Sequence, residues 1–232
     1  MRKHKTQQII GTILFASLLL AAVFTLVRLI LTPSGSSDDA MHRSDYVLML
    51  IQCVLGLVVM MLPSLLSRRW AIPIPSFIYV LYYVFLYCAI FLGEVFSFYY
   101  RVPHWDTILH CFSGAMLGAL GFILVTILNE DAHVRVQLSP FFVSLFAFCF
   151  SMAMGALWEI YEYAVDLTMG LNMQKYLTQA GEIVAGQAAL TDTMQDILSD
   201  ALAALAVSAA GFVSLRRERK KRNEAAQESV SV

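Results

Sequence analysis

Long apolar stretches, separated by short clusters of charged, Pro, Gly or Asn residues, dominate the pattern of this chain. An α-helix needs about 20 apolar residues to cross a bilayer, and six stretches are long enough. The expected membrane spans are 9–32, 46–66, 75–100, 107–128, 140–166 and 192–215. The pattern therefore predicts an all-α fold, a polytopic membrane helical bundle in which residues 1–215 form a single six-span domain. Residues 216–232 are basic and then polar, and we expect them to form a disordered cytoplasmic tail.

Composition supports a membrane protein and excludes several other classes. The 232 residues are 59% hydrophobic and only 14% charged, whereas a soluble domain carries about 25% charged residues. The formal net charge of -1 gives no reason to expect a nucleic-acid partner. The four cysteines lie inside apolar runs without a C-x-x-C pair, which argues against a disulfide scaffold or a Cys-ligated zinc.

The distribution of lysine and arginine predicts how the spans are oriented. With a cytoplasmic N-terminus, twelve Lys and Arg residues lie inside, and four lie at the outer side, namely Arg28, Arg43, Arg101 and Lys175. Positive residues favour the cytoplasmic side, so both termini are expected there. The first span is too long for the apolar region of a signal peptide and lacks a small-x-small cleavage site, so we interpret it as an uncleaved anchor. We expect a multi-pass protein of the bacterial cytoplasmic (plasma) membrane.

Acidic residues are unexpectedly frequent in the apolar spans. An ionisable side chain at the centre of a membrane helix costs about 2.5–3.5 kcal/mol, so each needs an explanation. With the N-terminus inside, all of these acids fall in the outer half of the bilayer. The eight residues are Glu94, Asp106, Glu159, Glu162, Asp166, Asp192, Asp196 and Asp200.

Helical spacing groups most of these acids on shared faces. Residues three, four, seven or eight positions apart lie on one side of a helix. The resulting sets are Asp106 with His110; Glu159, Glu162 and Asp166; and Asp192, Asp196 and Asp200. His104 lies just before the fourth span, after Pro103, where it can fold back over the same face.

This arrangement predicts a divalent metal ion. Carboxylates this close together stay protonated unless a cation neutralises them, and carboxylates with imidazole suit zinc, manganese, iron or magnesium. Inward-facing acids on bundle helices build the sites of di-metal carboxylate proteins. Asp106 is expected to act as a general base and His104 as a proton shuttle at the mouth. The expected metal ligands are His110, Glu159, Glu162, Asp192 and Asp196.

The segment 167–191 is expected to cover the outer side. It is too apolar for a free linker and too interrupted for a span, so we expect an interfacial or re-entrant lid. Its role stays open, as do those of Asp166 and Asp200. Glu94 has an alternative role as an interface residue paired with Arg28.

Two further groups of residues have a structural interpretation. Aromatic residues at the outer boundary, including Tyr99, Tyr100 and Trp105, are typical of an aromatic belt. Small residues in the fourth and sixth spans let helix backbones approach closely. They include Gly114, Gly118 and Gly121, with several alanines between 201 and 210.

Three blocks of the chain, in this order, resemble the YjdF-like family of bacterial inner-membrane proteins, whose function is unknown. They read H-W-D-x-x-x-H at 104–110, W-E-x-x-E-Y at 158–163 and D-T-x-x-D at 192–196. The resemblance covers about residues 99–205 and departs at Tyr163, where Trp is expected. VanZ-like membrane proteins show a weaker similarity, with the same order of blocks. The YjdF-like resemblance implies that the shared residues are His104, Asp106, His110, Glu159, Glu162, Asp192 and Asp196.

Neither resemblance implies a reaction, so the function has to be inferred from the residues. They favour a metal-dependent hydrolase or transferase that acts on a lipid or envelope precursor at the outer leaflet. A cation- or proton-coupled transporter is one alternative, but it predicts acids further inward or helices broken at the midplane, and the sequence shows neither. A metal-stabilised, non-catalytic partner of another membrane protein is a second alternative. Membrane lipids are the expected partners, and the oligomeric state stays open.

Overall fold

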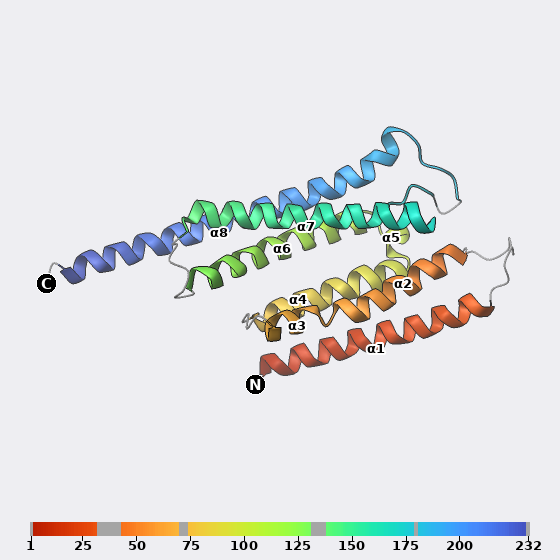
Figure 1. The fold of residues 1–232 in the computed structure, drawn as a ribbon, viewed down its shortest axis with the longest axis horizontal. Helices are drawn as coiled ribbons and strands as arrows, with labels where there is room; N and C mark the ends of the chain where they lie inside the picture. Colours follow the sequence, from red (N-terminus) through yellow and green to blue (C-terminus); the bar gives the residue numbers. More distant parts are fainter. Residues whose placement is uncertain (1, 32–42, 70–73, 131–137, 179–180, 231–232) are drawn as a thin grey trace. The chain divides into compact units, whose positions relative to one another are not determined.

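A computed structural model of the chain describes residues 2–31, 43–69, 74–130, 138–178 and 181–230 (Figure 1). In these residues the only extended pairing is an isolated bridge between Leu177 and Ile183. The helical elements are α1 (Arg2–Leu31), α2 (Arg43–Val59), α3 (Leu62–Arg69), α4 (Ser76–Leu86), the π-helix η1 (Tyr87–Val95), α5 (Phe98–Arg101), α6 (Trp105–Glu130), α7 (Pro140–Met169) and α8 (Gln187–Val230).

Helices in the described chain are long and apolar enough to cross a membrane in six places. The all-α polytopic fold predicted from the sequence is therefore confirmed. Large apolar side chains on these helices are exposed, such as Leu20 and Ile30 at 70% and 72%, as expected for surfaces that contact lipid tails. The six stretches are Lys5–Leu31, Ser44–Arg69, Ser76–Val95, Trp105–Thr126, Pro140–Met169 and Gln187–Glu228.

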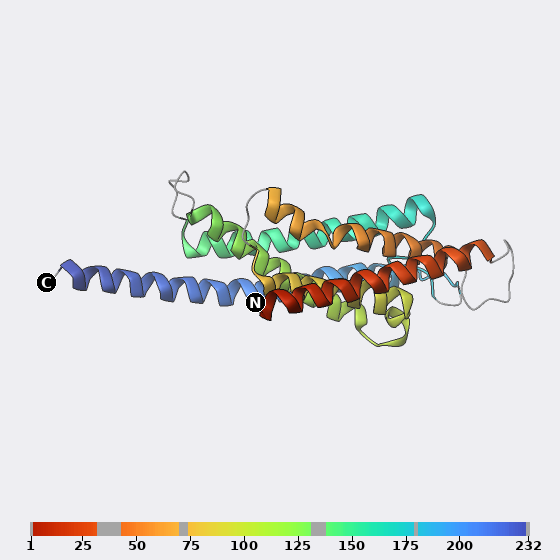
Figure 2. The ribbon, with the colours of Figure 1, turned by 90° about the horizontal axis from the view of Figure 1, so that it is seen from below.

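The structure divides into two compact units, of which the first comprises Met1–Leu109 and Trp158–Asp196. In this unit α1 lies beside α2 and α4 (Figures 1 and 2). Leu18 of α1, Cys53 of α2 and Tyr83 of α4 belong to one buried apolar core. The three helices pack together because each has small or apolar residues at helical spacing along one face.

The third span ends differently from its prediction. After α4 the chain continues as the π-helix η1, and Ser97 then takes a left-handed φ of 58°. This break stops the span at Val95, short of the predicted residue 100. A Cβ on Gly93 would lie 2.5 Å from the ring of Tyr99, so the bare glycine lets this ring pack against η1.

The second unit comprises His110–Leu157 and Ile197–Val232, and its helices approach closely at small residues, as the sequence predicts. A Cβ on Gly121 of α6 would lie 2.8 Å from the Cα of Ala147 of α7. The Ser151 hydroxyl of α7 donates a hydrogen bond of 2.9 Å to the Gly114 carbonyl. Small side chains and a hydroxyl that reaches a neighbouring backbone are typical of membrane helix packing.

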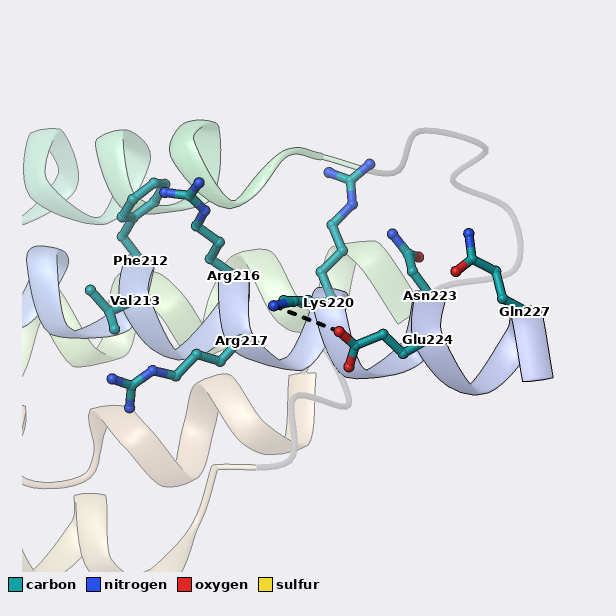
Figure 3. Close-up of a pocket in the computed structure, with 9 residues that line it drawn as sticks. Phe212, Val213, Arg216, Arg217, Lys220, Asn223, Glu224 and Gln227 are labelled. Atoms are coloured by element: carbon teal, nitrogen blue, oxygen red, sulfur yellow. Dashed lines mark ion pairs between the residues drawn. The ribbon is translucent and has the colours of Figure 1, made fainter. Parts of the chain in front are cut away.

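The C-terminal segment differs from the expected disordered tail. Helix α8 continues through residues 216–230, which are rich in strong helix formers such as Arg, Lys, Glu and Ala. Its cations are exposed, and Lys220 pairs with Glu224 at 3.6 Å (Figure 3). This part of α8 is therefore held by local helix formation rather than by packing.

Candidate metal centre

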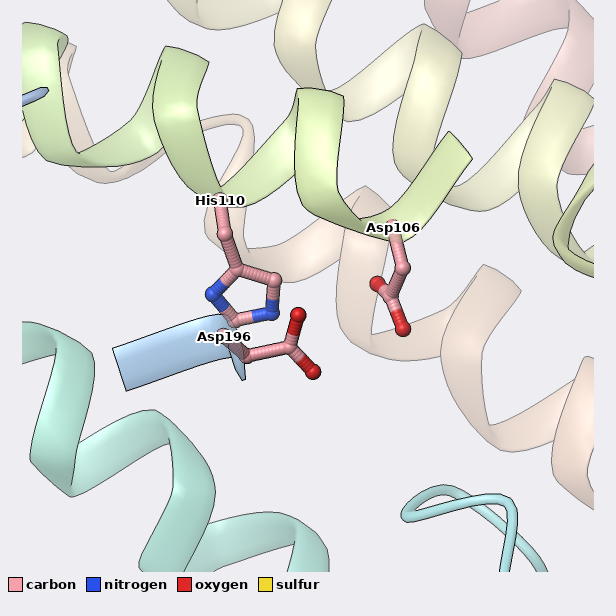
Figure 4. A group of neighbouring side chains, drawn as sticks. All are labelled: Asp106, His110 and Asp196. Carbon is pink, nitrogen blue, oxygen red and sulfur yellow. The ribbon is translucent and has the colours of Figure 1, made fainter. Parts of the chain in front are cut away.

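Three side chains bring their metal-ligand atoms within 4.8 Å of one another, namely Asp106, His110 and Asp196. Asp106 and Asp196 belong to the first unit, and His110 follows Asp106 by one turn of α6. Figure 4 shows these three side chains as neighbours. His110 and Asp196 are 7% and 4% exposed, and Asp106 is half-buried. The group therefore offers one nitrogen and two carboxylate ligands in a largely buried place, a donor set that suits a divalent transition metal.

Asp200 controls the orientation of His110. The Nδ1 atom of His110 lies 3.1 Å from Oδ2 of Asp200, and the Ser113 hydroxyl donates to Oδ1 of Asp200 at 3.0 Å. An ionised aspartate only accepts hydrogen bonds, so Nδ1 of a neutral ring carries the proton and Nε2 keeps its lone pair. In Figure 4 the outer ring nitrogen of His110 points toward the Asp196 carboxylate. The sequence left the role of Asp200 open, and this bond assigns it to positioning His110.

Two glycines make room for Asp200 within the second unit. A Cβ on Gly114 would lie 2.7 Å from the Asp200 carbonyl oxygen, and one on Gly155 would lie 2.5 Å from Oδ2. Real Cβ atoms do not approach this closely, so a side chain at Gly114 would require α8 to move, and one at Gly155 would displace the Asp200 carboxylate. Asp200 itself is only 2% exposed. Its carboxylate is thus fixed by backbone packing as well as by hydrogen bonds.

The other predicted ligands lie nearby but outside the converging group. Glu159 of α7 is buried, and Glu162 and Asp192 are half-buried. The charges that act on Glu162 are those of Glu159, Asp196 and Asp192, so the acidic faces of α7 and α8 meet in the first unit. The assignment of Glu159, Glu162 and Asp192 as ligands stays a prediction. Asp106, predicted to be the base, lies among the converging ligands.

His104 lies at the surface. Its side chain is exposed, and its backbone takes a left-handed φ of 58° just before α6 begins. The positive φ turns the chain into α6 and is uncommon for a residue other than glycine. The proton-shuttle role stays a prediction.

Lys175 brings a positive charge into this acidic region, a contact that the sequence pattern does not predict. Its ammonium pairs with Oδ2 of Asp106 and lies 4.6 Å from the ring centroid of Tyr99. The Lys175 side chain is 20% exposed. Burial lowers the pKa of Lys175, while the carboxylates of Asp192, Asp196 and Glu94 raise it in part. Part of the acidic charge is therefore neutralised by the chain itself.

Tyr99 lies among the same acids instead of serving only in an aromatic belt. Burial raises the pKa of the Tyr99 phenol well above its usual value, and the carboxylates of Glu94, Glu162 and Asp196 raise it further. The phenol therefore stays protonated and can donate a hydrogen bond. Sequence alone could not distinguish Tyr99 from its neighbour Tyr100, because only the packing against η1 selects it.

Between α7 and α8, residues 170–178 form a hydrogen-bonded loop, and the lid role stays a prediction. The carboxylate of Asp166 accepts hydrogen bonds from the backbone N–H groups of Met173 at 2.7 Å and Gln174 at 2.9 Å. Leu171 and Met173 are buried against Leu48 of α2. Asp166 thus has a structural role, because it anchors the loop that carries Lys175.

Replacing Asp166 with asparagine is expected to loosen this loop. Asparagine has one acceptor oxygen where aspartate has two, so one of the two amides loses its partner. We expect a loss of about 1–3 kcal/mol of stability and faster amide hydrogen exchange at Met173 and Gln174. Glu182→Gln is the matched control, since it removes an exposed carboxylate of the same loop. Unchanged exchange at both amides in Asp166→Asn would contradict the anchor role.

Comparison with known proteins identifies the family of the chain. No curated protein and no solved structure matches it. Residues 12–217 match a family described as "Predicted membrane protein (DUF2238)". This range includes all six candidate spans in whole or in part and the three converging ligands. The chain therefore belongs to this family of predicted membrane proteins and is a multi-pass membrane protein.

Proposed function

We propose that this protein binds one divalent metal ion at Asp106, His110 and Asp196 and uses it in a hydrolase or transferase reaction on a lipid or envelope precursor. The observation that supports this most is the convergence of three ligand atoms within 4.8 Å. Isolated acids in membrane helices are costly and mark functional sites by default. Here two of them share their place with a buried imidazole.

The state of His110 supports a metal ligand in particular. A histidine that binds a metal usually donates its other ring N–H to a carboxylate, which fixes the ring and raises its basicity. Asp200 occupies that position at 3.1 Å from Nδ1. A histidine that only fills a core does not need a carboxylate held in place by two glycines. The packed Asp200 behind His110 therefore favours a metal site over a chance cluster of acids.

The surrounding residues suit chemistry on an oxygen-rich substrate. A bound divalent ion supplies Lewis acidity toward a phosphoryl or acyl oxygen and lowers the pKa of bound water. Glu159 and Glu162, one turn apart on α7, provide carboxylates for proton transfer within the first unit. Tyr99, with its protonated phenol, offers a hydrogen-bond donor to the same region.

The positive charges near the C-terminus bear on how the chain is oriented in its membrane. The exposed Arg216, Arg217 and Lys220 follow the apolar part of α8 (Figure 3), which favours a cytoplasmic C-terminus by the positive-inside rule. We propose both termini inside and the metal group toward the outer side of a bacterial plasma membrane. The narrower resemblance to the YjdF-like family fits this location and stays a prediction.

Metal analysis of the protein tests the binding part of the proposal. The full chain, purified in detergent without chelator, is expected to carry about one divalent ion per molecule, and Asp196→Asn is expected to lose most of it, because a metal site depends on its ligand count. Glu218→Gln is the matched control, because it neutralises an exposed acid far along α8. Wild-type protein without bound metal, or Asp196→Asn with full occupancy, would refute the site.

Lipid analysis tests the reaction. Cells that carry only Asp196→Asn are expected to accumulate a lipid or envelope precursor that cells with wild-type protein or Glu218→Gln do not. Unchanged lipids together with normal metal content in the wild type would favour the metal-stabilised, non-catalytic role instead.

A further inference from the structure

We propose that Lys175 is a tethered counter-cation of Asp106, and that a divalent ion and this ammonium compete for the Asp106 carboxylate. The inference rests on the proposed metal function and adds a regulatory element to it. Lys175 lies on the loop between α7 and α8, in the same unit as Asp106, so the contact involves one compact body.

The loop is built to hold Lys175 in this position. Met173 and Gln174, the two residues before Lys175, donate their backbone N–H groups to the Asp166 carboxylate and are fixed by it. The side chain of Asn172 donates to the Leu177 carbonyl at 2.8 Å and accepts from the Leu177 amide at 2.8 Å. Lys175 itself takes a left-handed φ of 50°, which is rare for a side chain of this type. Such a backbone is kept only where the surrounding contacts determine it.

The surroundings of the ammonium form a cation subsite. The Asp106 carboxylate pairs with it, and the Tyr99 ring lies 4.6 Å away on another side. Carboxylate and aromatic face are both favourable partners for a cation. Asp196, a further member of the converging group, adds its negative charge to this place. The chain thus inserts one of its own cations where the acids converge.

Competition follows from the shared carboxylate. Asp106 is both the partner of the ammonium and one of the three converging ligands. Two cations bound to one carboxylate repel each other, so a divalent ion is expected to drive the ammonium away. Lysine suits this exchange, because its charge sits on a flexible four-carbon stem that can swing while the loop stays anchored.

Chemical labelling of Lys175 tests the displacement directly. In metal-free protein an amine-reactive ester is expected to label Lys175 slowly, and added Mn²⁺ or Zn²⁺ is expected to accelerate this labelling, as read by mass spectrometry. Lys220 is the internal control, because its side chain is 78% exposed and pairs only with Glu224 of its own helix turn in the described contacts. In Asp106→Asn, labelling of Lys175 is expected to be fast with or without metal.

Metal affinity in three Lys175 variants separates competition from simple charge repulsion. Lys175→Met removes the competing ammonium. It is expected to bind metal about tenfold more tightly, if the ammonium is away from Asp106 in about a tenth of the wild-type molecules. Lys175→Arg keeps the charge but grips a carboxylate through two N–H groups, so it is expected to bind metal more weakly than wild type. Simple repulsion predicts equal affinities for Lys and Arg. Lys220→Met is the matched control and is expected to behave as wild type.

The outcomes distinguish this inference from the proposed function. Metal-dependent labelling with the affinity order Met, Lys, Arg supports both. Wild-type protein that binds metal while labelling stays constant and Lys175→Met has wild-type affinity overturns the competition and leaves the metal site standing. Absence of metal binding in wild type, Lys175→Met and Lys220→Met alike overturns both.

Discussion

Asp200→Asn is expected to lower the affinity for a divalent ion by about 10- to 100-fold, the usual effect of losing a carboxylate behind a metal-binding histidine. Asparagine offers one acceptor oxygen to two donors, the His110 ring and the Ser113 hydroxyl. If its amide N–H₂ turns toward Nδ1, the ring proton moves to Nε2 and blocks the ligand atom. If its oxygen stays there, the imidazole still loses the basicity that the negative charge gives it.

Titration of chelator-treated protein with Mn²⁺ or Zn²⁺ measures this effect. The thermal midpoint without metal is recorded in parallel, since a purely structural role for Asp200 changes the midpoint and not the affinity of the protein that remains folded. Ser113→Ala is a partial control: it removes one hydrogen bond and leaves the Asp200 charge on His110, so a smaller loss is expected. Equal metal affinities of wild type and Asp200→Asn would contradict the positioning role.

Gly114→Ala is expected to destabilise the protein by about 1–3 kcal/mol, the usual cost of overpacking a tight core. Its new Cβ would lie 2.7 Å from the Asp200 carbonyl oxygen, which is backbone and cannot swing aside. Either α6 and α8 separate or Asp200 shifts, so metal affinity is expected to fall as well. The measurements are the thermal midpoint in detergent and the metal titration.

Gly118→Ala provides a matched control one turn further along α6. Its Cβ would lie 3.5 Å from the Val207 side chain, an ordinary van der Waals contact. Alanine favours the helix over glycine by about 1 kcal/mol, so this variant is expected to be as stable as wild type or more stable. A Gly114→Ala protein with the same midpoint and metal affinity as Gly118→Ala would show that the close approach at Asp200 does not matter.

The helices could be predicted because hydropathy over about 20 residues is a strong signal. All six spans appear near their expected places, while their ends differ for local reasons. The third stops early at the left-handed Ser97. The sixth begins at Gln187, before its first predicted residue, since Ala188, Ala189 and Leu190 are strong helix formers. The helix beyond residue 215 depends on the helix propensity of its Arg, Lys, Glu and Ala residues. The polar composition of this segment instead suggested a disordered tail.

The candidate site could be predicted only in part. Spacing placed Asp106 and His110 on one face, and the position of Asp196 at the same depth suggested that they meet. Spacing predicted Asp196 as a ligand but could not show which acid faces which nitrogen of His110, so the role of Asp200 stayed open. Lys175 was missed for another reason: its place depends on a folded loop and a positive φ, which no periodic pattern records.

The π-helix at Tyr87–Val95 determines how the third span would respond to the loss of one residue. A π turn holds one residue more than an α turn, so loss of a single residue there would let the span close as an ordinary α-helix. Because both kinds of turn complete one revolution, the side chains beyond the deletion would keep nearly the same direction around the axis. Tyr99, which follows η1, would then stay on its side of the span. Relatives with a one-residue gap in this stretch should therefore keep the aromatic ring beneath the lysine, whereas the same gap in a regular α-helix would turn all later side chains by about 100°.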